Sequence, residues 1–84
     1  MSEKYFVYIL KSKRDGKGYT GFTADLENRM RQHSENTGGY TKGRGPWELI
    51  WYGVFEDRQL AEDFERYLKS GSGIAFSRKR LVRM

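Results

Sequence analysis

Two basic side chains stand on the face of a predicted helix that should turn toward a hydrophobic core. Leu26, Arg29, Met30 and His33 recur at spacings of three and four residues, which places them on one stripe. Cations are rarely buried unless they are paired, so a stripe with a purely structural role would not be expected to carry both of these residues. A guanidinium can grip a phosphate, and an imidazole can take up a proton near neutral pH. The alternative is that both side chains lie at the rim of the core and extend toward solvent.

Two tyrosines fall on one face of a predicted β-hairpin. Its strands are expected at residues 5–10 and 18–22, joined by a two-residue turn or by a longer loop of even length. If the loop has an even number of residues, the numbers of two residues that lie opposite each other add to an odd sum. The numbers of Tyr8 and Tyr19 also add to an odd sum, so both side chains point to the same side of the sheet. A sheet tyrosine is most often a core residue with its hydroxyl at the edge, and this interpretation stays open beside a chemical role.

One carboxylate, Glu65, lies at the border of the apolar stripe of a later predicted helix, with Lys69 one turn further on. A glutamate at such a position is usually solvated, or forms an ion pair with a lysine four residues later.

The charge distribution indicates a polyanionic partner. The chain has 16 Lys and Arg against 11 Asp and Glu, a net charge of +5. A glycine-rich loop interleaves aromatic and cationic side chains, which suits a nucleic-acid backbone with unstacked bases: Tyr40, Lys42 and Arg44. No acidic residue follows Glu65, whereas six cations do: Arg66, Lys69, Arg78, Lys79, Arg80 and Arg83. The alternative is that cations at a helix end complement the helix dipole.

The elements that must position these residues follow the order ββαβαα. After the hairpin, the first helix begins at Thr23 or Asp25 and ends near His33, and a third strand is expected over 47–55. Asp57 caps a helix with an apolar stripe of Leu60, Ala61, Phe64, Tyr67 and Leu68, and a last helix runs from Ile74 to about Val82. This order predicts an α/β (α+β) fold, in which a small three-stranded antiparallel sheet is flanked by helices.

Length and composition exclude several other classes of protein. Eighty-four residues suffice for one domain, expected to span residues 1–84, and 15% aromatic residues are too many for a disordered chain. The absence of cysteine excludes disulfide scaffolds and thiolate zinc sites. The longest apolar run, 5–10, is far shorter than the roughly 20 residues of a membrane span. We therefore expect a cytoplasmic protein with no membrane contact.

Taken together, these residues resemble the GIY-YIG nuclease superfamily, and in particular its small stand-alone, single-domain branch. The resemblance rests on Val7-Tyr8-Ile9, on Tyr19-Thr20-Gly21, on Arg29, and on Ala61 followed four positions later by Glu65. It covers nearly the whole chain. The first motif departs from the family name, because only the tyrosine of Gly-Ile-Tyr aligns.

The resemblance implies a phosphodiesterase site that uses one divalent ion, Mg²⁺ or Mn²⁺, held by Glu65. The catalytic residues that it implies are Tyr8, Tyr19, Arg29, His33 and Glu65. The residues expected to contact nucleic acid are Tyr40, Lys42, Arg44, Lys69, Arg78, Lys79 and Arg80. Lys79 stands where many active members have an asparagine.

Phosphodiester hydrolysis needs a deprotonated water and stabilisation of charge on the phosphate oxygens. Arg29 would grip the phosphate. Tyr8 would be the base if nearby cations lowered its pKa from about 10, with His33 as the rival base. Tyr19 would orient the water or the phosphate.

The expected function is therefore DNA endonuclease-like hydrolysis, selective for structure rather than sequence because a domain of this size has little surface for reading a long site. No small-molecule cofactor and no protein partner is indicated. One alternative, motivated by Lys79, is a catalytically weak or inactive nucleic-acid-binding module. Another is a subunit whose site serves only when tethered to a second protein. The carboxylate of Glu65 favours the enzyme, because binding alone would not require a group that repels phosphate.

Overall fold

The computed structural model describes residues 3–34 and 45–83 of the chain. Its elements occur in the predicted order ββαβαα: β1 (Tyr5–Ser12), β2 (Gly18–Thr23), α1 (Leu26–Ser34), β3 (Trp47–Phe55), α2 (Arg58–Leu68) and α3 (Gly71–Arg80). Tyr40, Lys42 and Arg44 lie outside the described residues. Within the described ranges, no helix is long and apolar enough to cross a membrane.

The three strands form one antiparallel sheet with β1 in the centre and β2 and β3 at its edges. In the hairpin, Tyr8 lies opposite Gly21 and Leu10 opposite Tyr19. Their numbers add to an odd sum, so the predicted parity is confirmed. The connection is the longer even loop: the Ser12 N–H donates to the Lys17 carbonyl at 2.8 Å, which leaves four residues between them.

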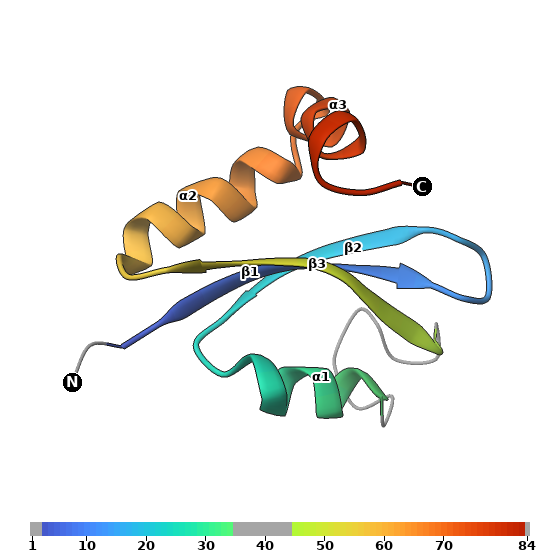
Figure 1. Cartoon of the computed structure of the whole chain (residues 1–84), viewed down its shortest axis with the longest axis horizontal. Helices are drawn as coiled ribbons and strands as arrows, with labels where there is room; N and C mark the ends of the chain where they lie inside the picture. The colour runs from blue at the N-terminus through green and yellow to red at the C-terminus, as the bar shows by residue number, and fades with distance from the viewer. Residues whose placement is uncertain (1–2, 35–44, 84) are drawn as a thin grey trace.

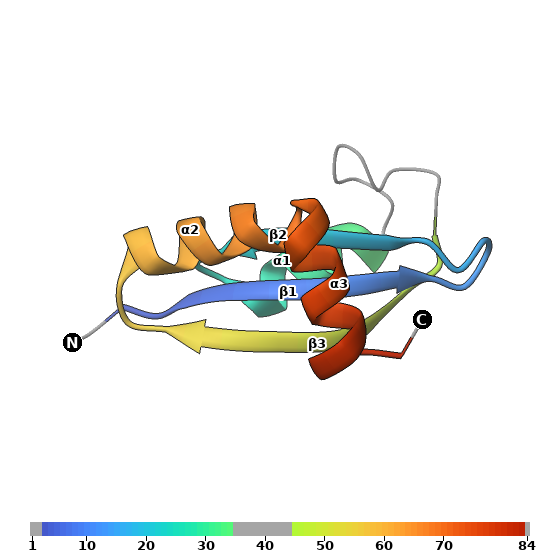
Figure 2. The same ribbon diagram turned by 90° about the horizontal axis from the view of Figure 1, so that it is seen from above.

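Helices cover both faces of the sheet, with α2 and α3 on one side and α1 on the other (Figure 1). Figure 2 looks onto the sheet with α2 and α3 in front. The central strand alternates between the two layers, because successive side chains of a strand point to opposite faces. Val7 and Ile9 join Ala61 and Leu68 in the core beneath α2. Tyr8 faces the layer of α1, and it is fully buried.

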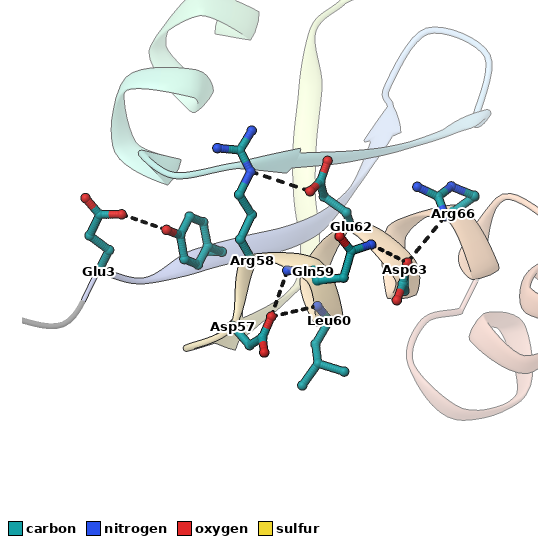
Figure 3. Close-up of polar contacts among 9 residues, drawn as sticks. Glu3, Asp57, Arg58, Gln59, Leu60, Glu62, Asp63 and Arg66 are labelled. Carbon is teal, nitrogen blue, oxygen red and sulfur yellow. Dashed lines mark hydrogen bonds and ion pairs between the residues drawn. The ribbon is translucent and has the colours of Figure 1, made fainter.

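Capping residues set where the first two helices begin. Asp57 accepts hydrogen bonds from the backbone N–H groups of Gln59 and Leu60, at 2.8 and 3.2 Å, and so caps α2 as predicted (Figure 3). For α1 the choice between two caps resolves to Asp25, whose carboxylate accepts from the Asn28 N–H at 3.0 Å.

Three details of the helices differ from the sequence prediction. The last helix begins at Gly71 rather than Ile74, because the Ser70 hydroxyl accepts from the Gly73 N–H at 3.1 Å and caps a turn that the glycines concealed. It ends at Arg80, two residues before the predicted end. Leu60 is exposed and does not belong to the buried stripe of α2. Neighbours on a helix lie about 100° apart, so burial of Ala61 turns Leu60 away.

Candidate active site

A tyrosine and a histidine meet in the layer between the sheet and α1. Tyr8 is 0% exposed and His33 is 4% exposed, and a hydrogen bond of 3.1 Å joins the Tyr8 hydroxyl to His33 Nε2. The alternative in which His33 lies at the rim of the core is therefore wrong, because its ring is buried and supplies the partner that a buried phenol requires. Arg29, one turn earlier on α1, is half-buried.

Tyr19 closes this cluster from β2. Its ring centroid lies 6.4 Å from that of Tyr8 and 5.7 Å from that of His33. The placement follows from the hairpin register, which puts both tyrosines on the face that α1 covers. Tyr19 is only half-buried, in contrast to the buried Tyr8 and His33.

Gly21 is a residue of the site that our sequence-based list of site residues omitted. A Cβ atom built at this position would overlap the phenol oxygen and ring of Tyr8. Only glycine lets the ring lie across β2. The signal was present in the sequence, because an isolated glycine inside a strand pattern indicates close approach of another group.

Burial keeps both members of the Tyr8–His33 pair neutral at neutral pH. Desolvation, assisted by the nearby Tyr19, raises the pKa of Tyr8 to about 12, although the charge of Arg29 and a polar contact with its side chain lower it. Desolvation followed by the charge of Arg29 lowers the pKa of His33 below its usual value of 6.5. The nearby cation that we expected to activate the Tyr8 phenol is thus present, but burial outweighs its effect on the pKa.

Glu65 comes to the site from α2, on the other face of the sheet. The negative charge of Glu65 contributes to the raised pKa of Tyr8, so the two groups lie within electrostatic reach. Its side chain is 19% exposed and forms an ion pair of 2.5 Å with Lys69. The pairing that the sequence suggested is therefore present. Because β2 is an edge strand, groups from α1 and α2 can both approach the same edge of the sheet.

The carboxylate of Glu65 is the type of ligand that suits a hard ion such as Mg²⁺, which keeps most of its waters. Among residues 3–34 and 45–83, no group of three or more histidine, aspartate or glutamate side chains could enclose a metal. Zinc sites need three or four protein ligands, whereas Mg²⁺ is commonly held by one or two carboxylates and substrate phosphate. Glu65 as the one protein ligand fits the second case.

The predicted DNA-contacting residues that the structure describes lie on the helices of the α2–α3 layer. Lys69 follows α2, and three exposed cations occupy the last turn of α3: Arg78, Lys79 and Arg80. These three also complement the dipole of α3, so their position fits both interpretations given above.

Residues 4–75 match the family model of the GIY-YIG catalytic domain. The chain belongs to the GIY-YIG family. Among its relatives, the UPF0213 protein CPE1444 of Clostridium perfringens is 45% identical over 65 residues, 76% of this chain and 69% of that protein. The UPF0213 protein SSP2268 of Staphylococcus saprophyticus is 34% identical over 98% of this chain and 94% of its own length. The names of these relatives state no activity.

A solved GIY-YIG relative has the same fold. The solution NMR structure of the UPF0213 protein BH0048 from Bacillus halodurans superposes with a TM-score of 0.55 at 36% identity, covering 87% of this chain and 80% of that one. The resemblance inferred from the sequence and the predicted α+β architecture are both confirmed. Membership of this family implies a nuclease-type activity.

The buried histidine predicts how stability depends on pH. Unfolded His33 titrates near pH 6.5, whereas the lowered pKa keeps the folded residue neutral, so between these values the unfolded chain binds more protons. The free energy of unfolding should therefore rise as the pH increases from about 5 to 7 and level off above. His33 is the only histidine of the chain, so His33→Gln should flatten this slope.

Thermal unfolding of both proteins at half-unit steps between pH 5 and 7.5 measures the difference. Each kcal/mol corresponds to roughly 4–8 °C in Tm for a domain of this size. Equal slopes for wild type and His33→Gln would contradict the buried, neutral histidine.

Proposed function

We propose that this protein is a divalent-metal-dependent DNA endonuclease, selective for branched or flap structures rather than for sequence. The observation that supports this most directly is the Tyr8 phenol, hydrogen-bonded to His33 and within electrostatic reach of Arg29 and Glu65. A proton acceptor, a cation for phosphate and a metal-binding carboxylate are the three groups that phosphodiester hydrolysis requires.

Glu65 would hold Mg²⁺ or Mn²⁺ after exchanging its ion pair with Lys69. Once bound, the ion supplies positive charge to the phosphate oxygens and lowers the pKa of a coordinated water. The exchange leaves the Lys69 ammonium available for a DNA phosphate. The half-buried Arg29 guanidinium would stabilise the charge that develops on the non-bridging oxygens.

Proton transfer would run through the neutral Tyr8–His33 pair. The raised pKa makes a Tyr8 phenolate too costly near pH 7, so the phenol takes the proton of the attacking water only as it gives its own proton to His33 Nε2. This requires the His33 tautomer that is protonated on Nδ1. Tyr8 is fully buried, so this step requires a local opening that admits the attacking water.

A second candidate function is a nucleic-acid-binding module with little or no catalytic activity. Two observations favour it: the complete burial of Tyr8, and the Glu65 carboxylate already paired with Lys69. Lys79, at the position where many active members have asparagine, points the same way. Both functions use the same cations, so cleavage assays and not binding assays separate them.

Replacement of Arg29 by alanine should reduce single-turnover cleavage of a labelled flap substrate by about 10²–10³, the usual cost of removing a donor aimed at developing charge. Arg31→Ala is the matched control. Arg31 carries the same charge two residues later but is exposed and donates to Asn28 at 2.6 Å. The control should stay within about threefold of wild type, since exposed charges contribute little. Equal losses in the two variants would contradict the role of Arg29 at the phosphate.

Replacement of Glu65 by glutamine should abolish cleavage that depends on Mg²⁺ or Mn²⁺. DNA affinity without metal should stay equal or increase, because one charge that repels phosphate has been removed. Lys69→Met breaks the same ion pair from the other side and should weaken DNA binding while cleavage keeps its metal dependence. Filter binding and flap cleavage, each with and without metal, give the comparison.

If Glu65 only forms a surface ion pair, the two substitutions should behave alike. Each would then cost about 0.5 kcal/mol of stability and leave cleavage unchanged. A wild-type protein that binds DNA but cuts no duplex, flap or branched substrate with either ion would establish the binding-module alternative.

A further inference from the structure

A cavity of about 570 Å³ opens between the sheet and the helices α2 and α3. Its volume lies within the range of small-molecule pockets. Ile9 and Thr20 line it from the sheet, and Leu68 and Ile74 line it from the helices. The helices that line it, α2 and α3, cover the face of the sheet opposite to α1 (Figure 1), and neither Tyr8 nor His33 lines the cavity.

The lining of the cavity combines an apolar surface with positive charge. Ile9, Leu68 and Ile74 provide the apolar surface, while Lys69 and Arg78 provide two cations. Among the described residues that line it, none is acidic. This chemistry suits a ligand with a flat, weakly polar body and an anionic group, which is the description of a nucleotide.

The position of the cavity connects it to the proposed active site. Lys69, one of its two cations, is the residue paired with Glu65 at 2.5 Å. Tyr19 also lines the cavity and packs against the rings of Tyr8 and His33. A DNA strand with one phosphate beside Glu65 would therefore place a neighbouring nucleotide at the mouth of this cavity.

We propose that the cavity receives one unpaired nucleotide of the DNA strand being cut. Its base would lie against Ile9, Leu68 and Ile74, and its phosphate would lie between Lys69 and Arg78. This inference rests on the proposed function and gives it a physical basis for selectivity. A base inside a duplex is stacked and paired and must be extruded first, whereas a base at a flap or branch is already free to enter.

A variant pair separates the cavity from the general positive charge of the protein. Ile74→Glu places a carboxylate at the cavity wall, and Ala75→Glu places the same charge on the next residue, which is exposed and does not line the cavity. Both residues are exposed positions of α3, so both variants should fold. Circular dichroism checks folding before binding is measured.

Binding is first measured without metal, by titrating thymidine 3′,5′-bisphosphate into isotopically labelled protein and following amide shifts. We expect shifts at Thr20, Ile74 and Ser77, with a Kd that increases at least about tenfold in Ile74→Glu and less than about twofold in Ala75→Glu. Inorganic phosphate is titrated in parallel. Identical shifts and Kd values for phosphate would overturn the proposal, because the base would then contribute nothing.

The DNA arm compares two flap substrates that differ in the unpaired nucleotide beside the junction, one with its base and one abasic. Wild type and Ala75→Glu should cut the abasic flap about tenfold more slowly, and Ile74→Glu should cut both at the same low rate. Equal cleavage rates for the two flaps, together with no amide shifts at the cavity on addition of the bisphosphate, would overturn the cavity proposal. The nuclease proposal would still stand. Bisphosphate binding at the cavity in a protein that cuts no DNA supports the cavity and contradicts the nuclease.

Discussion

A buried phenol in the central strand is the constraint on which the rest of the site depends. Tyr8 lies in a strand that is covered on both faces, so its hydroxyl must find a hydrogen-bond partner inside the protein. His33 provides that partner at 3.1 Å, and Gly21 leaves room for the ring. The hydrogen bond to this hydroxyl requires His33 of α1 to face the sheet. Arg29 lies one turn earlier on the same helix.

Lys69 has a corresponding role on the other face of the sheet. It neutralises Glu65 in the structure described here, and it also lines the cavity between the sheet and α2 and α3. A group that binds at either place changes the electrostatic environment of the other. We propose that a metal ion at Glu65 and a nucleotide phosphate at Lys69 favour each other's binding. Each ligand would break the Glu65–Lys69 ion pair and so leave the other residue available for the second ligand.

Much of this arrangement follows from local patterns in the sequence. The hairpin register put Tyr8 and Tyr19 on one face by parity alone, and Asp57 marked the start of α2. The burial of His33 could not be predicted locally, because a polar residue on an apolar stripe is buried only when another element supplies its partner. The raised pKa of Tyr8 has the same origin, since desolvation depends on packing between strand and helix.

Other features arise only from packing between elements distant in the sequence. The cavity joins residues of β1, β2, α2 and α3, and no single segment carries its signature. The start of α3 was missed because glycines weaken the helical pattern, while the deciding contact was the cap at Ser70. The contact between Glu65 and Lys69 was recognisable from spacing, but the position of Lys69 on a cavity wall shared with residues of β2 was not.

The central claim is that the buried Tyr8 hydroxyl passes a proton from water to His33, and the most direct test is Tyr8→Phe. This change keeps the ring and removes one oxygen, and Tyr52→Phe, at an exposed tyrosine of β3, is the control. Our account predicts that single-turnover flap cleavage by Tyr8→Phe falls by about 10²–10⁴ at unchanged DNA affinity. The acid-side decrease of the wild-type rate, expected only below pH 6.5 because burial lowers the pKa of His33, should disappear. A folded Tyr8→Phe protein that cleaves at the wild-type rate, with the wild-type pH dependence, would contradict it.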